Sequence, residues 1–154
     1  PSALIEKACS FNDYDCGTEF TLDGGIVIKT GQLNHPNGAC GYRIEFAGKV
    51  IAICTDTEHF EDRIDENVIG LAQDADIMVY DSAYTDDEYP NFKGWGHSTW
   101  QEALKVAEAA NVKKTFLFHH DPSHNDEKMD LIAEEVSKLR EGVRPAIEGE
   151  TIAI

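Results

Sequence analysis

The sequence predicts an α/β fold in which a β-sheet is covered by helices. Short apolar runs typical of strands fill the first half of the chain, and helical and strand-like segments alternate in the second half. Hydrophobic residues make up 42% of the 154 residues and charged residues 27%, which suits a packed core rather than a disordered chain. We therefore expect residues 1–154 to form a single domain or half-domain.

The first half of the chain is dominated by strand signals. Residues 25–29 (GIVIK), 42–46 (YRIEF) and 50–54 (VIAIC) each combine β-branched and apolar residues. Ala47-Gly48 supplies a turn between the last two runs and so predicts a β-hairpin. Residues 31–40 hold a cluster of Asn, Pro and Gly, which predicts a loop.

The second half alternates helices and strands. Residues 61–73, 98–110 and 127–140 carry apolar side chains every three or four positions, which predicts three helices. The short runs at 77–80 (IMVY) and 115–118 (TFLF) predict buried strands between them. Connections of this kind place strand ends along one edge of a sheet, where sites form in layered α/β folds.

Three local signals complete the predicted elements. Ser98 is expected to cap the second predicted helix. Residues 2–7 predict a short helical turn, and residues 150–154 (ETIAI) predict a final edge strand.

The chain is strongly acidic, with 13 basic and 29 acidic residues and a net charge of −16. Such a surface would not displace counterions from a nucleic-acid backbone, so nucleic-acid binding is not expected. A small anionic substrate held by metal ions remains compatible with this charge, and the simplest role of the acidic surface is solubility. No apolar run is long enough to span a membrane and no signal-like segment begins the chain, so we expect a cytoplasmic protein.

Four cysteines occur, at Cys9, Cys16, Cys40 and Cys54, and none forms a CxxC pair. Without a secretory signal we expect them to be reduced cytosolic thiols. A zinc site built from them has little support from their spacing.

Candidate metal ligands follow two predicted strands. His119 and His120 come directly after TFLF, and Asp56 closes VIAICTD. Imidazole and carboxylate groups are common metal ligands, so these positions are candidates. The alternatives are a pair of surface histidines and a carboxylate that caps the next turn.

Three further residues have side chains suited to a site. His35 lies in the loop at 31–40, and His97 comes directly before the strongest helix, where the helix dipole disfavours the cationic imidazole and would poise it for proton transfer. Asp81 ends the strand IMVYD and would hydrogen-bond an imidazole to fix its tautomer. Local capping is the alternative for His97 and Asp81, and His59 is expected at the surface.

Five segments in order resemble a known family. Residues 34–44 (NHPNGACGYRI) resemble a loop in which a metal-binding His precedes a Gly-Tyr-Arg strand, and 55–57 (TDT) resemble a strand-end Asp that bridges two metals. Residues 76–85 (DIMVYDSAYT) resemble a strand and acidic turn, with Asp81 in place of a Glu. Residues 96–99 (GHST) resemble a His-Ser-Thr loop, and 112–119 (VKKTFLFH) resemble the strand that delivers the last metal-binding His.

Together these segments are similar to the metallo-β-lactamase-fold hydrolases, in their ribonuclease Z and phosphodiesterase-like branch. The resemblance implies an αββα sandwich with two divalent metal ions, zinc foremost and manganese or iron as alternatives. His35, Asp56 and His119 would be metal ligands, with His120 an open alternative to His119. A metal-bound hydroxide would attack a small anionic phosphodiester, and His97, oriented by Asp81, would donate a proton or contact the phosphate.

The sequence departs from the family in one respect. The string His-x-His-x-Asp-His, which supplies four ligands in the family, does not occur, and 34 residues precede His35. The resemblance therefore covers the C-terminal half of the sandwich. A fragment, a natural half that pairs with another chain or with itself, and a sequence given without its N-terminal part are all compatible with this.

Two other functions stay open. One is hydrolysis of a thioester, lactone or amide, and the other is a metal-poor half-domain that acts as an oligomerisation or binding module. Cleavage of transfer RNA is not expected, because that branch uses a basic protruding arm which this sequence lacks.

Overall fold

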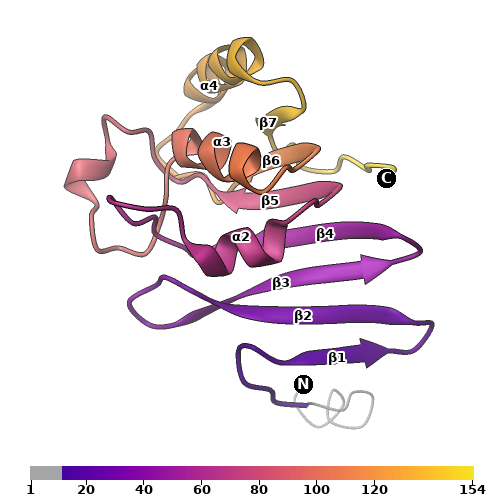
Figure 1. Ribbon diagram of the computed structural model, residues 1–154. Helices are drawn as coiled ribbons and strands as arrows, with labels where there is room; N and C mark the ends of the chain where they lie inside the picture. The colour runs from indigo at the N-terminus through magenta and orange to yellow at the C-terminus, as the bar shows by residue number, and fades with distance from the viewer. Residues whose placement is uncertain (1–11) are drawn as a thin grey trace, which may run out of the picture.

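Seven strands form one sheet whose spatial order follows the chain from β1 to β7 (Figure 1). The computed structural model describes residues 12–154, so the helical turn predicted at 2–7 lies outside the described residues. The strands are β1 Glu19–Leu22, β2 Ile26–Leu33, β3 Ala39–Phe46, β4 Lys49–Cys54, β5 Ile77–Asp81, β6 Lys114–Phe118 and β7 Val143–Pro145. The first four pair antiparallel, and β4 to β7 run parallel.

The predicted hairpin of β3 and β4 is confirmed. Its turn is Ala47-Gly48, with φ of 50° and 76°, and Phe46 pairs with Lys49 across it. Positive φ at both central residues gives the backbone twist that a two-residue hairpin turn needs. The loop predicted at 31–40 is shorter than expected, because residues 31–33 continue β2.

Three α-helices and one short 3-10 helix accompany the sheet in the described part of the chain. They are α2 Glu66–Ala72, α3 Trp100–Ala109, α4 Asp126–Leu139 and the 3-10 helix η1 Tyr89–Asn91. The three predicted α-helices are thus confirmed in position. α2 begins five residues later than predicted, and the N-cap of α3 is Thr99 rather than Ser98, since the Thr99 hydroxyl accepts a hydrogen bond from Glu102 N–H.

Sequence reasoning was wrong at both ends of the sheet. Residues 150–154 form no strand, and β1 and β7, of four and three residues, were not predicted. Strands this short carry too little hydrophobic periodicity to be read from sequence.

The helices cover one face of the sheet. Side chains from α2, α3 and α4 join strand residues such as Ala52, Met78 and Leu117 in one core cluster. The Arg43 guanidinium donates to the carbonyls of Leu71 and Gln73 at the end of α2, so Arg43 also faces the helices.

The opposite face of the sheet is apolar. Side chains alternate along a strand, so Ile44, next to Arg43, points away from the helices. Ile28, Ile44, Ile51 and Ile77 lie side by side across four strands. Within residues 12–154 no helix covers this face (Figure 1), which is the one-sided arrangement expected of half a sandwich.

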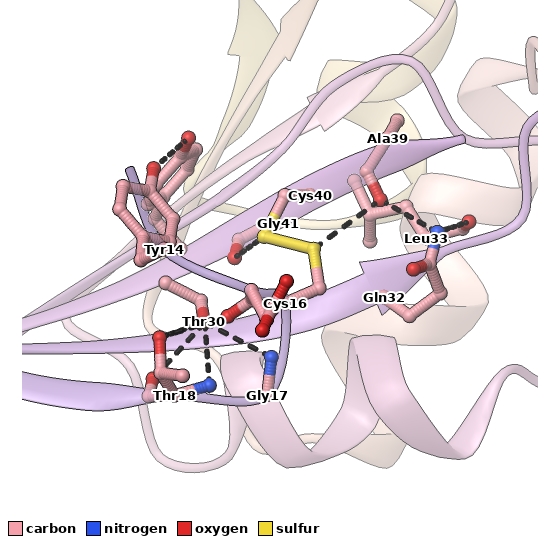
Figure 2. Close-up of a disulfide and its surroundings, with 12 residues drawn as sticks. Tyr14, Cys16, Gly17, Thr18, Thr30, Gln32, Leu33, Ala39, Cys40 and Gly41 are labelled. Carbon is pink, nitrogen blue, oxygen red and sulfur yellow. Dashed lines mark hydrogen bonds between the residues drawn. A yellow bond between two sulfur atoms is a disulfide. The ribbon is translucent and has the colours of Figure 1, made fainter. Parts of the chain in front are cut away.

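A disulfide ties the segment before β1 to β3 (Figure 2). Cys16 bonds to Cys40, and the Thr30 hydroxyl accepts hydrogen bonds from Gly17 and Thr18 N–H. The expectation that all cysteines are free thiols is therefore wrong for this pair, because folding brings together residues 24 positions apart. Cys54 is a free, buried thiol, and burial raises its pKa to about 12. Cys9 lies outside the described residues.

Among the helices of residues 12–154, none has the length and apolar character needed to cross a membrane.

Candidate metal centre

Three of the predicted site residues lie where parallel neighbouring strands end. Asp56 follows β4, Asp81 is the last residue of β5, and His119 follows β6 directly. Because the carboxyl ends of parallel strands meet at one edge of a sheet, these side chains gather there. His35, from the loop between β2 and β3, and His97, before α3, reach the same edge.

The structure brings all five predicted site residues together. Nε2 of His119 lies 3.8 Å from Oδ1 of Asp56. One ligand atom each from His35, Asp56 and His97 lie within 4.8 Å of one another, and the same holds for Asp81, His97 and His119. Imidazole nitrogens and carboxylate oxygens are the donors that zinc takes in catalytic sites, so the donor chemistry fits a divalent metal.

His119 rather than His120 joins this cluster of ligand atoms in the described residues. The His97 and His119 rings stack with centroids 4.7 Å apart. His120 is turned into the protein, where both ring nitrogens are buried, and this burial lowers its pKa. The geometry thus supports the alignment of His119 as the ligand.

Two of the candidate ligands have an unusual backbone conformation. Asp56 has φ of 61° and His119 has φ of 63°, both in the left-handed region. A non-glycine residue held there costs on the order of 1–3 kcal/mol and is found mainly where the surrounding structure has a functional use for it. Asp56 lies two residues after β4 and His119 directly after β6, so both of these left-handed residues lie at the cluster. The other non-glycine residues with positive φ in the described part of the chain are Ala47, Asp74 and Asn111.

The Asp81 carboxylate forms hydrogen bonds that hold several residues of the cluster in place. Its carboxylate is fully buried and accepts hydrogen bonds from the backbone N–H of Asp56 at 2.9 Å and of Ser98 at 3.1 Å. It also lies 2.9 Å from Nδ1 of His97. A proton on Nδ1 that is donated to this carboxylate leaves Nε2 of His97 free to face the other imidazoles.

The expectation that the helix dipole disfavours cationic His97 is wrong. The hydrogen bond to Asp81 raises the pKa of His97, and burial opposes this rise without cancelling it. A buried carboxylate in direct contact outweighs the partial charge at a helix end.

Sequence reasoning missed Glu58. This buried carboxylate accepts hydrogen bonds from Gly94 N–H at 2.7 Å, Gly96 N–H at 2.9 Å and the Tyr89 hydroxyl at 2.6 Å. Burial raises its pKa, but the three donors more than offset this, and the pKa is lowered. The loop Gly94–Gly96 is thereby fixed, although no local pattern around Glu58 indicates these distant partners.

The fixed loop packs against His35. Gly96 has φ of +92°, and a Cβ at this position would lie 2.2 Å from Cδ2 of His35. A glycine is therefore needed for His35 to occupy its place. In the sequence, only the glycines on both sides of Trp95 (GWG) indicate that the backbone here approaches another group closely.

His59 is not the surface residue expected from sequence. It is half-buried, its Nδ1 lies 3.0 Å from Ser98 Oγ, and its ring lies 4.2 Å from that of Tyr89. Burial lowers its pKa. His59 thus supports the loop that carries His97 rather than facing solvent.

The chain matches the family model of the beta-lactamase superfamily domain over residues 2–120. The ribonuclease Z of Oceanobacillus iheyensis is 32% identical over 119 residues, covering 77% of this chain and 35% of that protein. The ribonuclease Z of Lactobacillus helveticus is 29% identical over 144 residues, covering 88% of this chain and 42% of that protein. The chain thus spans less than half the length of these relatives.

Solved structures agree on the fold. The metallo-beta-lactamase fold protein YhfI from Bacillus subtilis matches with a TM-score of 0.72 at 18% identity, covering 89% of this chain and 53% of that one. The short form of human tRNase Z matches with a TM-score of 0.66 at 20% identity, covering 88% of this chain and 46% of that one. With the family model matching most of its length, the chain belongs to the beta-lactamase superfamily, as its motifs predict.

Proposed function

We propose that this chain carries part of the active site of a metal-dependent phosphodiesterase. The observation that carries the proposal is the 3.8 Å approach of His119 Nε2 to Asp56 Oδ1 at adjacent strand ends, with the Asp81–His97 pair beside it. Two candidate ligands in the left-handed region and a fully buried carboxylate lie together at this sheet edge, a combination that is common at functional sites.

In this proposal His35, Asp56 and His119 would hold the two divalent ions, zinc foremost, with Asp56 shared between them as the resemblance implies. When bound, the ions neutralise charge on the phosphate and lower the pKa of a water. The Asp81 carboxylate orients His97 through Nδ1, so that the opposite nitrogen is directed at the phosphate or at the leaving oxygen. The raised pKa of His97 favours the protonated form that a proton donor needs.

The proposal that the substrate is a phosphodiester rests on the names of the similar proteins. Several are named ribonuclease Z, and one structure of similar fold is described as a diphosphatase from the PhnP family. These names do not support the expectation, drawn from net charge, that nucleic-acid binding is unlikely. Hydrolysis of a thioester, lactone or amide stays the alternative reaction, with no contact in the described residues that favours it.

The donor set in this chain is incomplete for two ions. We propose that the family's His-x-His-x-Asp-His motif completes it from an N-terminal half that packs on the apolar sheet face, or from another protomer. The second candidate function, a metal-poor half-domain acting as a binding or oligomerisation module, is favoured by the absence of that motif from the sequence.

Metal content separates the two functions. We expect zinc titrated into the 154-residue chain to bind, and Asp56→Asn and His119→Ala to weaken it by about 100-fold or more, because even residues that only orient a ligand cost 10–100-fold. Asp62→Asn, at an exposed position outside the cluster, is the matched control. Hydrolysis of bis(p-nitrophenyl) phosphate is expected once the missing motif is supplied by a linked or co-expressed N-terminal half. Zinc binding that is unaffected by Asp56→Asn and His119→Ala would overturn the proposal.

A further inference from the structure

A cavity of about 430 Å³ opens beside the candidate metal centre. His97 and His119 are among the residues that line it, together with the aromatic residues Tyr84, Trp95 and Phe118. Trp95 is 62% exposed and Phe118 is 48% exposed. Trp95 thus places an exposed ring beside the candidate ligands, whereas Phe118 lies on the sheet face of Ile77 that the proposed N-terminal half would partly cover.

The exposed ring of Trp95 has a firm support. Phe92 stacks on Tyr84 with ring centroids 4.3 Å apart, and Trp95 packs edge-on against Phe92 at 5.4 Å. The backbone on both sides of Trp95 is held by Glu58, through Gly94 N–H and Gly96 N–H. A buried carboxylate therefore fixes the position of an exposed tryptophan, which lowers the entropic cost of binding a ring there.

We propose that this cavity, the aromatic subsite (Tyr84, Trp95 and Phe118), binds the nucleobase of a nucleoside phosphodiester whose phosphate lies against His97 and His119. The inference rests on the proposed function and narrows its substrate class. Aromatic walls next to a phosphate-directed cluster match a substrate with a planar ring on one side of the reacting phosphorus. Cavities of this size accommodate a ligand of nucleoside dimensions.

Charge favours a base over a second phosphate in the subsite. The Asp121 carboxylate also lines the cavity, and it accepts a hydrogen bond from the backbone N–H of Ser123 at 2.8 Å. A phosphate beside it would meet like charge, whereas a neutral base stacks without penalty. The net charge of −16 adds to this preference for a substrate with few phosphates.

The test compares two probes of similar charge on the 154-residue chain. Adenosine 5′-monophosphate carries a base, and ribose 5-phosphate lacks it. Trp100 is 5% exposed, so quenching of tryptophan fluorescence by a ligand reports on Trp95. We expect adenosine 5′-monophosphate to quench this fluorescence in the absence of metal and ribose 5-phosphate to leave it unchanged.

Variants localise the binding. Trp95→Ala is expected to weaken binding of adenosine 5′-monophosphate about tenfold, measured by saturation-transfer NMR on the ligand, because base stacking on an aromatic side chain contributes that much. Phe46→Ala is the matched control, since Phe46 is 53% exposed but lies at the far end of β3. Equal binding of both probes, no binding of either, or an unchanged affinity in Trp95→Ala would overturn the proposal.

Zinc separates this inference from the proposed function. Trp95→Ala is expected to keep the zinc affinity of the unmodified chain, because Trp95 offers no ligand atom to the cluster. If the chain binds adenosine 5′-monophosphate through Trp95 but binds no zinc, the aromatic subsite is supported and the proposed phosphodiesterase function is contradicted. If the chain binds zinc through Asp56 but binds adenosine 5′-monophosphate no better than ribose 5-phosphate, the proposed function is supported and the aromatic subsite is contradicted.

Discussion

Nδ1 of His97 lies 2.9 Å from the carboxylate of Asp81, and the same carboxylate oxygen accepts the backbone N–H of Asp56 at 2.9 Å. One buried group thus holds both the imidazole that faces the cluster and the backbone of a candidate metal ligand. Changes at Asp81 should therefore affect stability and metal binding together.

Asp81→Asn is expected to lower the free energy of unfolding by about 1–3 kcal/mol. The amide keeps the size of the carboxylate, but its NH₂ group faces backbone donors and leaves buried N–H groups without an acceptor. Zinc affinity should fall 10–100-fold, because the orientation of the neighbouring ligands is lost. Urea denaturation and zinc titration measure the two effects, with Asp87→Asn, at an exposed residue, as control. Normal zinc affinity in Asp81→Asn would contradict the positioning role.

Gly96→Ala and Gly94→Ala form a matched pair. Both glycines have positive φ, near +90°, so each substitution carries backbone strain of about 1–2 kcal/mol. A Cβ at Gly94 would meet nothing within 4 Å, whereas one at Gly96 would collide with His35. We expect the two variants to lose similar backbone stability, and Gly96→Ala alone to lose zinc affinity as well. Equal zinc affinity in both would show that His35 is not a ligand.

The residues of the candidate centre could be predicted from sequence because each lies next to a strong local signal. Asp81 ends an apolar strand and Asp56 and His119 lie within two residues of one, and parallel strands bring such ends together without any further information. His35 and His97 have weaker local signals, and they were found through the order of the motifs.

The supporting contacts could not be predicted in the same way. Glu58 reaches Gly96, 38 positions away, and Cys16 reaches Cys40, 24 positions away. Such pairs depend on how the sheet edge and the loops fold over one another, which no spacing in a single sequence encodes. The same reason explains the wrong expectations for His59 and for the charge state of His97, whose partners are distant in sequence or buried.

Glu88 should make the free energy of unfolding depend on pH in the acid range. Burial raises the pKa of Glu88, but hydrogen bonds from Thr85 and Lys128 and the charge of His124 lower it to about 2, from an ordinary value of 4.5. Because the folded pKa is depressed, this group stabilises the fold above about pH 4.5 and loses its contribution as the pH falls toward 2.

The variant Glu88→Gln should lack this pH-dependent contribution to the free energy of unfolding. The curve of unfolding free energy against pH should become flatter between pH 4.5 and 2 by about 1–2 kcal/mol, a value discounted for partial solvent exposure. Thermal unfolding across this pH range measures the change. Glu141→Gln, at an exposed position, is the control and should keep the slope of the unmodified chain. An unchanged slope in Glu88→Gln would mean that the contacts with His124 and Lys128 do not persist in solution.

Replacing the linked cysteines should destabilise the fold without disturbing the candidate centre. The bond closes a loop between positions 24 apart, and removing such a cross-link costs about 3 kcal/mol through the entropy of the unfolded chain. We expect the double variant Cys16→Ser, Cys40→Ser to lower the free energy of unfolding by this amount. The unmodified chain treated with a dithiol should show the same lowered free energy of unfolding. Cys54→Ser is the contrasting variant, since it places a hydroxyl in the core and should destabilise the chain equally with or without the dithiol. Mass spectrometry after alkylation counts the free thiols, and a chain whose stability ignores the dithiol would contradict a structural role for the Cys16–Cys40 bond.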